Sequence, residues 1–130
     1  MDNCLFCKIA RGQIPAHKVY EDDNFLAFLD INPQTVGHVQ VIPKTHFRFV
    51  WDLPDSISAK KDGPNVGAYF EVARKIALAQ KKAFKTDLVM SKIIGEEVPH
   101  AHIWVFPSSE ATGDKKDFET NKQKIIDNLN

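Results

Sequence analysis

The pattern of apolar and polar positions along the chain predicts five short strands. Strands are indicated where apolar residues alternate with polar ones, or form short unbroken runs, between Pro, Gly, Asn and Asp residues. The segments that fit are residues 17–21, 25–30, 38–43, 88–94 and 98–106. Turn-forming residues separate several of them, at positions 22–24, 32–37 and 95–97. We therefore expect strands joined largely by short connections.

One long helix is predicted between the third and fourth strands, over residues 66–84. Apolar residues recur there at steps of three and four, as at Tyr69, Ala73 and Ile76, while Arg74 and Lys75 occupy other positions. A short helix is expected over residues 4–11, ending at Gly12, and a short helical turn over residues 56–61. The apolar spacing from Phe118 to Leu129 predicts a closing amphipathic helix after a polar loop at 108–116.

These elements together predict an α+β domain. Strands that follow one another through short turns favour antiparallel pairing. The expectation is a five-stranded antiparallel sheet with one main helix and a short N-terminal helix. We expect a single domain over residues 1–130, with its core in 4–107 and a C-terminal tail in 108–130.

Charge and composition narrow the classes of partner. Lys and Arg together equal Asp and Glu, so the formal net charge is zero, and 43% of the residues are hydrophobic. Overall charge thus gives no support to binding of nucleic acid or of an anionic membrane. No apolar stretch approaches the roughly 18 residues needed to cross a bilayer, and the first residues lack the pattern of a signal peptide. We expect a cytoplasmic protein.

The two cysteines, Cys4 and Cys7, form a Cys-x-x-Cys pair. In a reducing cytosol such a pair is a metal clip or a redox pair more often than a structural disulfide. By itself the motif is a weak zinc signal, because a zinc site needs about four nitrogen or sulfur ligands. A free thiol pair is the remaining alternative.

The segment over residues 98–107 carries the strongest chemical pattern. On a strand, His100, His102 and Trp104 share one face, and the intervening apolar residues point the other way. Two imidazoles and an indole are costly to bury unless each polar nitrogen finds a partner. The alternative is a half-exposed strand whose polar side chains face solvent.

This segment closely resembles the signature of the histidine-triad (HIT) family, in which three histidines alternate with apolar residues. The resembling positions are Gly95, Val98, Pro99, His100, His102, Trp104 and Pro107. Segments around residues 6–15, 20–22, 26–33 and 37–46 are also similar to that family, in its order. The resemblance covers about residues 4–107 and implies the HIT-like fold.

The resemblance implies that His102 is the nucleophile. A neutral imidazole attacks phosphorus well near pH 7, and the resulting phosphoramidate is labile to water. His100 would orient the site, and His38 resembles a further histidine of the network, unless it is a strand-end histidine satisfied by backbone. The implied activity is that of a hydrolase or nucleotidyl transferase acting at the α-phosphate of adenine dinucleotides or nucleoside phosphate conjugates.

Trp104 departs from the family pattern, which usually has histidine there. An indole donates one hydrogen bond but exchanges no proton, so leaving groups that need protonation would suffer most. The alternative is that Trp104 only packs. The loop at Gly95 and Glu97, which would lie beside the nucleotide, is short and has no Asn. Glu96 stands where the family often has Gln, and an acidic group beside a phosphate is unfavourable.

The nucleoside would lie against residues from the first half of the chain. Asp30 resembles the ribose-binding carboxylate of the family, which accepts hydrogen bonds from two hydroxyls. The base pocket would be lined by Phe6, Ile9, Leu29 and Ile31. The alternative is that these four are ordinary core residues. A purine base is the expectation from the family.

The resemblance also implies a metal and a partner subunit. Some members with the Cys-x-x-Cys pair hold a structural zinc, and Cys4, Cys7, His46 and His100 supply the four ligands here. HIT proteins are commonly homodimers joined through the main helix and the adjacent edge strand, here residues 88–94. Two rival functions stay open: a purine-nucleotide sensor or scaffold without turnover, and a Cys-x-x-Cys redox or zinc-storage module.

Overall fold

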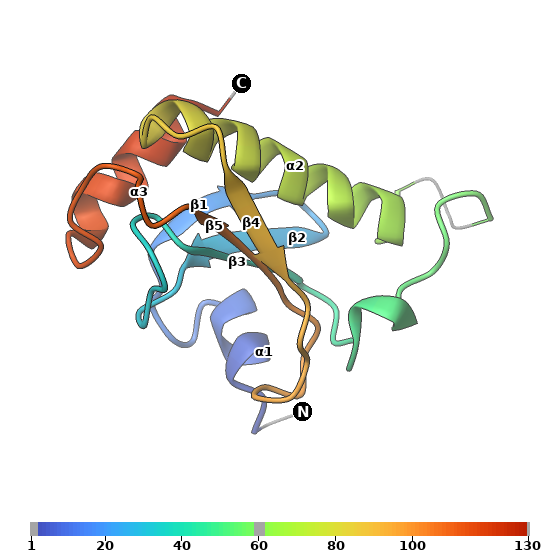
Figure 1. Ribbon diagram of the computed structural model, residues 1–130. Coiled ribbons are helices and arrows are strands. Elements are labelled where there is room, and N and C mark those ends of the chain that lie inside the picture. The colour runs from blue at the N-terminus through green and yellow to red at the C-terminus, as the bar shows by residue number, and fades with distance from the viewer. Residues whose placement is uncertain (1–2, 59–61, 130) are drawn as a thin grey trace.

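The chain folds around a single antiparallel sheet, seen in a computed structural model that describes residues 3–58 and 62–129 (Figure 1). Its strands are β1 (Lys18–Glu21), β2 (Phe25–Leu29), β3 (Val39–Pro43), β4 (Val89–Lys92) and β5 (Ile103–Pro107). They lie in the order β1-β2-β3-β5-β4, and every neighbouring pair is antiparallel. The predicted α+β class and five-stranded antiparallel sheet are confirmed.

Within residues 3–58 and 62–129, three α-helices accompany the sheet, and each begins at a side chain that caps it. They are α1 (Leu5–Ala10), α2 (Val66–Ala83) and α3 (Phe118–Asp127). The Cys4 Sγ, the Asn65 side chain and the Asp117 side chain accept backbone N–H groups of the first turns, which satisfies donors that a helix leaves free. A short 3₁₀ helix, η1 (Val50–Asp52), was not predicted. The helical turn expected at 56–61 is a turn at 56–58, and residues 59–61 lie outside the described residues.

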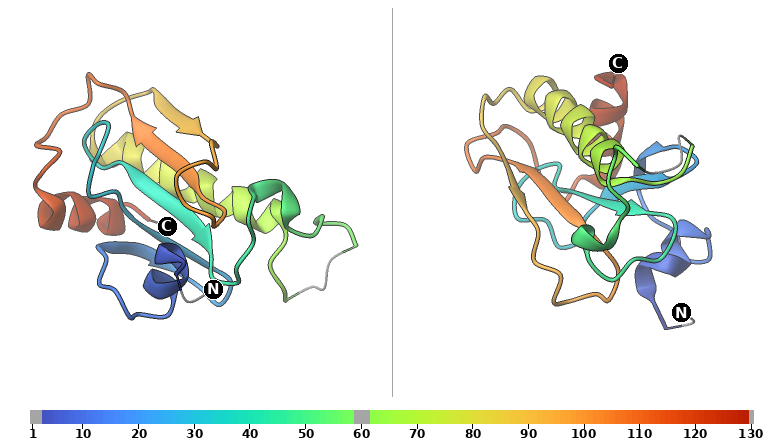
Figure 2. Two further views of the ribbon diagram at one scale, coloured as in Figure 1. Left: turned by 90° about the horizontal axis from the view of Figure 1, so that it is seen from below. Right: turned by 90° about the vertical axis from the view of Figure 1, so that its right-hand side faces the viewer.

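The sheet is covered on both faces at its centre. Figures 1 and 2 show α2 across one face and α1 against the other. Along β2, Leu26 and Phe28 pack with the apolar residues of α1, whereas Phe25 and Ala27 pack with those of α2. This double cover explains why β2 and β3 are buried at every position.

The strand predicted over residues 98–106 is wrong in its first half, because β5 pairs only from Ile103 to Pro107. Pro99 has no N–H to donate, and the backbone N–H of His100 bonds to the carbonyl of Val98 at 2.8 Å, which bends the chain. The alternation of faces still holds, because Ala101 and Ile103 enter the core under α2. The predicted strand at 88–94 is likewise shorter, as β4 covers only Val89–Lys92.

The C-terminal tail packs against α2 and β1. Ile125 is buried in the core, and Phe118 stacks on the ring of His17 with centroids 5.2 Å apart. Glu119 accepts a hydrogen bond from His17 at 3.1 Å. The tail therefore closes the sheet edge at β1. Among the described residues, no helix is both long and apolar enough to span a membrane.

Gln80, in the last turn of α2, ties the helix to the loop before β3 and to β5. Its Nε2 donates to the carbonyl of Gly37 at 2.9 Å and to that of Val105 at 2.8 Å, and the side chain is fully buried. Gly37 has a φ of 71°, and a Cβ there would lie 2.2 Å from a ring carbon of Phe84. This corner therefore fixes how the loop after β2 enters β3.

Replacing Gln80 by Leu should destabilise the fold by about 2–3 kcal/mol, because two buried carbonyls lose their donor while side-chain volume is kept. Urea unfolding followed by circular dichroism measures the change. Gln123→Leu, at an exposed position of α3, is the matched control and should shift stability by less than about 0.5 kcal/mol. Equal effects from both variants would contradict the role given to Gln80.

Candidate active site

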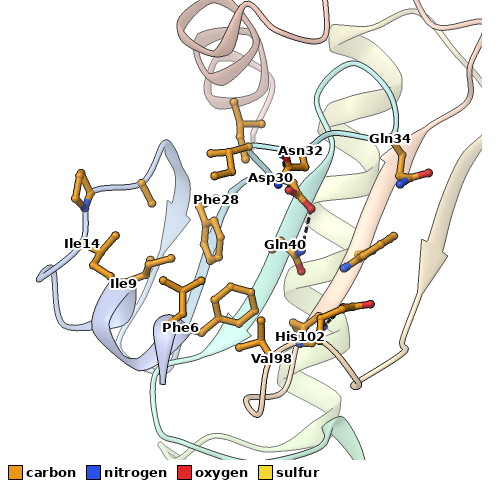
Figure 3. A pocket seen from close by; sticks show the side chains of 17 residues that line it. Phe6, Ile9, Ile14, Phe28, Asp30, Asn32, Gln34, Gln40, Val98 and His102 are labelled. Atoms are coloured by element: carbon orange, nitrogen blue, oxygen red, sulfur yellow. Dashed lines mark hydrogen bonds and ion pairs between the residues drawn. The ribbon is translucent and has the colours of Figure 1, made fainter. Parts of the chain in front are cut away.

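A cavity of about 460 Å³ lies on the α1 side of the sheet. Figure 3 shows Phe6, Ile9 and Phe28 on one side, and Asp30, Gln40 and His102 following one another down the other side. The whole lining consists of Leu5, Phe6, Ile9, Ile14, Pro15, Ala16, Phe28, Leu29, Asp30, Ile31, Asn32, Gln34, Gln40, Glu97, Val98, His102 and Trp104. Its size and its apolar wall with a few polar groups are typical of small-molecule sites.

Most of the residues predicted for nucleotide binding lie in this lining. Phe6, Ile9, Leu29, Asp30, Ile31 and Glu97 are all present. Gly95 is placed elsewhere, in a small cavity of about 30 Å³ that also touches His102, and its carbonyl accepts a hydrogen bond from Arg48 at 2.6 Å. Ile31 is 67% exposed and therefore forms the rim of the main cavity.

Phe6 links the apolar end of the cavity to the histidines. It follows the capping residue Cys4 by two positions, and its ring meets the edge of Phe28 at 5.6 Å and that of His102 at 5.3 Å between centroids. Ile9 lies three residues further along α1, on the same side of the helix. The short helix thus presents both side chains to the cavity.

Asp30 follows the last residue of β2, and its carboxylate is held in place on both oxygens. Oδ1 accepts the backbone N–H of Asn32 at 2.8 Å, and Oδ2 accepts the side-chain amide of Gln40 at 3.0 Å. The side chain is 15% exposed, so a ligand can still reach it. Sequence reasoning missed Gln40, although its place two residues after His38 on a predicted strand put it on the same face.

His102 is almost fully buried, and its orientation is set by backbone. Its Nδ1 lies 2.7 Å from the carbonyl oxygen of His100. A carbonyl only accepts, so Nδ1 carries a proton and Nε2 is the nitrogen left for chemistry. Nε2 lies 3.3 Å from a carboxylate oxygen of Glu97, whose side chain is about half exposed. The alternative of a half-exposed strand whose polar side chains face solvent is therefore wrong for His102.

His38 is neutral near pH 7. Burial lowers its pKa to about 4, opposed by the charge of Asp30 and reinforced by that of Lys92. Its Nδ1 accepts the backbone N–H of Gln34 at 3.0 Å, so its Nε2 carries the proton and lies 3.7 Å from Asp30. The ring meets Trp104 edge-on, with centroids 5.0 Å apart. His38 thus joins the site beneath Trp104.

Unpaired polar atoms gather at this point. In the described part of the chain, four buried side-chain nitrogen or oxygen atoms lack a hydrogen-bond partner, and three of them are His38 Nε2, Gln40 Oε1 and Trp104 Nε1. Gln40 and Trp104 are directly opposed in the pairing of β3 with β5. Buried polar groups are usually paired, so their concentration beside one cavity marks a place built for a polar ligand or water.

Four metal-ligand side chains meet on the other side of Phe6. Cys4 and Cys7 lie at the start of α1, His46 follows β3, and His100 precedes β5, with ligand atoms all within 4.8 Å of one another. Sulfur-to-Nδ1 distances are 3.2–3.3 Å. Tetrahedral zinc bonds of about 2.3 Å to sulfur and 2.0 Å to nitrogen would set these atoms roughly 3.5 Å apart. The cluster forms a possible metal site and fits the predicted set.

The electrostatics of the cluster suit a cation. The Nε2 of His100 donates to the carbonyl of Pro43 at 2.8 Å, which leaves Nδ1 with a lone pair directed at the two sulfurs. Burial lowers the pKa of His100 to about 4, so the ring is neutral. Burial and the neighbouring Cys4 raise the pKa of Cys7 to about 11, so a bound cation is what would hold the sulfur as thiolate.

The chain matches the family model "HIT domain" over residues 11–111. An uncharacterized HIT-like protein of Methanocaldococcus jannaschii is 35% identical over 97% of this chain and 95% of its own length. A HIT-like protein of Bartonella henselae, described as involved in cell-cycle regulation, superposes with a TM-score of 0.82 at 34% identity, covering 99% of this chain and 98% of its own.

Other relatives carry more specific descriptions. A zinc-bound histidine-triad protein of Mycobacterium smegmatis superposes with a TM-score of 0.74 at 30% identity, covering 98% of this chain and 94% of its own. An adenosine 5'-monophosphoramidase of Saccharomyces cerevisiae is 34% identical over 82% of this chain and 63% of its own. An adenylylsulfatase of Arabidopsis thaliana is 35% identical over 84% of this chain and 54% of its own. With its fold, its paired histidines and these matches together, the chain belongs to the histidine-triad family.

Proposed function

We propose that the protein is a nucleotide-binding hydrolase or nucleotidyl transferase that cleaves at the α-phosphate through a nucleotidyl-His102 intermediate. The observation that carries the proposal is the bond from His102 Nδ1 to the His100 carbonyl, which leaves Nε2 at the wall of a cavity large enough for a nucleotide. Its substrates would be adenine dinucleotides or nucleoside phosphate conjugates. The yeast and plant relatives act, by their descriptions, on two different adenosine conjugates, which supports this class.

Each part of a nucleotide has a matching part of the cavity. The base would enter the apolar end between Phe6, Ile9 and Phe28. The ribose hydroxyls would donate to the Asp30 carboxylate, which Gln40 holds in place. The α-phosphate would then lie at His102, at the polar end.

The first step forms a bond from His102 Nε2 to the α-phosphorus and breaks the bond from phosphorus to the leaving group. In the free protein Nε2 lies 3.3 Å from a carboxylate oxygen of Glu97. Glu97 is half exposed and free to turn towards solvent as the phosphate takes its place. His38 and His100 would support the reacting ring, His100 through its carbonyl.

The second step hydrolyses the intermediate. Water adds to phosphorus, the bond from Nε2 to phosphorus breaks, and a nucleoside monophosphate is released. Glu97, turning back from solvent, would accept the proton of that water. Trp104 exchanges no proton, so a leaving group that must be protonated would depart about 10²–10⁴-fold more slowly than with an acid at that position.

Zinc is the metal proposed for the Cys4, Cys7, His46 and His100 cluster. Two thiolates and two imidazoles are a common structural zinc set, and the M. smegmatis relative is described as zinc-bound. Such a metal would stabilise the fold and would not activate water or substrate, because four protein ligands close its coordination shell. It would also fix His100, whose carbonyl orients His102.

A purine-nucleotide sensor without turnover is the second candidate. Two features favour it: the indole of Trp104 in place of a proton-exchanging ring, and the carboxylate of Glu97 at the cavity, with Glu96 next to it in the chain. The test below separates the two candidates.

His102→Ala should abolish release of AMP from diadenosine polyphosphates and from an adenosine phosphoramidate, a loss of at least about 10³-fold. The reason is that no other group replaces the nucleophile. Product release is followed by chromatography, and intact-protein mass spectrometry seeks an adenylyl adduct on the wild type.

His17→Ala, which removes a histidine from the β1 edge, is the matched control and should keep its activity. Tight nucleotide binding by wild type with no AMP from either substrate would exclude the enzyme and leave the sensor. AMP release that persists in His102→Ala would exclude the covalent mechanism.

His46→Gln should reduce zinc content from one ion per chain and lower the unfolding temperature. His46 is the least buried ligand, so the variant is the mildest way to open the cluster. Metal is measured by mass spectrometry and stability by calorimetry, with a strong chelator applied to wild type in parallel. Folded wild type that contains no zinc and takes none up would disprove the assignment.

A homodimer through α2 and β4 is also proposed. β4 is an edge strand. Large apolar side chains are exposed close to it in the chain or on α2: the exposed fractions of Phe70, Leu78 and Leu88 are 41–57%. Edges and patches of this kind are usually covered. Light scattering should give twice the chain mass for wild type and a shift to monomer for Leu78→Lys. A monomeric wild type at micromolar concentration would refute the dimer.

A further inference from the structure

The charged side chains that line the cavity are acidic. They would repel any phosphate of a ligand that lies beyond the α-phosphate. These side chains are the carboxylates of Asp30 and Glu97, and neither Lys nor Arg occurs among the described residues that form the lining. Phosphate groups close to carboxylates repel them, and this repulsion is unfavourable unless a cation lies nearby. A ligand with further phosphates therefore needs a cation just outside this lining.

Lys92 is a cation in the right place. It is the last residue of β4 and stands directly opposite Trp104 in the pairing of β4 with β5. Opposed residues of an antiparallel pair project from the same face of the sheet. Its Nζ lies 5.8 Å from the centroid of the Trp104 ring and 5.9 Å from that of Phe106.

These aromatic contacts hold the exposed Lys92 ammonium on the cavity face of the sheet. Its charge also contributes to the lowered pKa of His38, which places it near the polar end of the site. Arg48, which lines the small cavity that also touches His102, is engaged by the Gly95 carbonyl and the face of Phe49.

The strand order gives the direction in which a ligand would extend. The base end lies at β2 with α1. Of the two ribose groups, Asp30 directly follows β2 and Gln40 lies on β3, and His102 directly precedes β5. The next strand beyond β5 is β4, about 4.8 Å further on. A group attached beyond the α-phosphate would continue over Trp104 towards Lys92.

The indole of Trp104 bears on which leaving groups the site can release. When His102 Nε2 bonds to the α-phosphorus, the bond from phosphorus to the bridging oxygen breaks, and that oxygen keeps the electron pair. A phosphate leaving group departs as an anion and needs no proton, whereas an amine does. An indole beside a fixed ammonium therefore suits an anionic leaving group.

We propose that Lys92 binds the phosphate next to the α-phosphate and selects nucleotides with a phosphate leaving group, such as dinucleoside polyphosphates, over amine conjugates. This inference rests on the proposed function. Lys92 is thus a specificity-determining residue at the strand edge.

Binding of AMP and of α,β-methylene-ADP, which resists cleavage at this bond, tests the proposal by calorimetry without any need for turnover. Wild type should bind the methylene diphosphate about tenfold more tightly than AMP, as one charge-assisted contact allows. Lys92→Gln should remove that preference and Lys92→Arg should restore most of it. Lys124→Gln, at an exposed position of α3, is the matched control and should keep the preference.

A kinetic measurement gives a second readout. The ratio of kcat/KM for a diadenosine polyphosphate to that for an adenosine phosphoramidate should fall about tenfold in Lys92→Gln. A preference or ratio that survives in Lys92→Gln, or that falls equally in Lys124→Gln, would overturn the role of Lys92 and leave the proposed function standing. Failure of wild type to bind either nucleotide would overturn both.

Discussion

The hydrogen bond from His102 Nδ1 to the His100 carbonyl is the constraint on which the rest of the site depends. His100 is held from three directions, because its Nδ1 faces the two cysteine sulfurs and its Nε2 donates to Pro43. The same residue therefore belongs to the possible metal cluster and orients the candidate nucleophile. Anything that loosens the cluster would loosen the imidazole that must meet phosphorus, which is how a closed metal site influences chemistry it does not perform.

The two-sided cover of the sheet explains where the cavity lies. α2 is an 18-residue helix that packs along one face of the sheet, whereas α1 is a six-residue helix that covers only part of the other face. The uncovered part, between α1 and the segment before β5, is the cavity. Its apolar end is made by the helix, and its polar end is made by strand termini and loops, where backbone leaves side chains free to face a ligand.

Charged side chains are distributed unevenly around the site. Burial keeps His38 and His100 neutral, so neither adds positive charge near the cavity. The charged side chains in the described lining are the carboxylates of Asp30 and Glu97. Under the proposal made for Lys92, its ammonium at the strand edge would favour ligands that extend across β5 to β4.

The local sequence determined the elements and the kinds of chemistry. Apolar alternation, caps and turn residues were enough for the five strands, for α2 and for the fold class, because these depend on neighbours in the chain. The resemblance to the HIT family named part of the cavity lining and the four residues of the cluster, but it missed Gln40 and misplaced Gly95. The bend at Pro99 is local, between Val98 and His100, and it ends the strand predicted there. The contacts of Gln40, Gln80 and Lys92 were decided by tertiary structure, because each joins groups from different elements of the fold. No local pattern encodes the distance between such residues, since it is fixed only when the sheet and its two covering helices pack together.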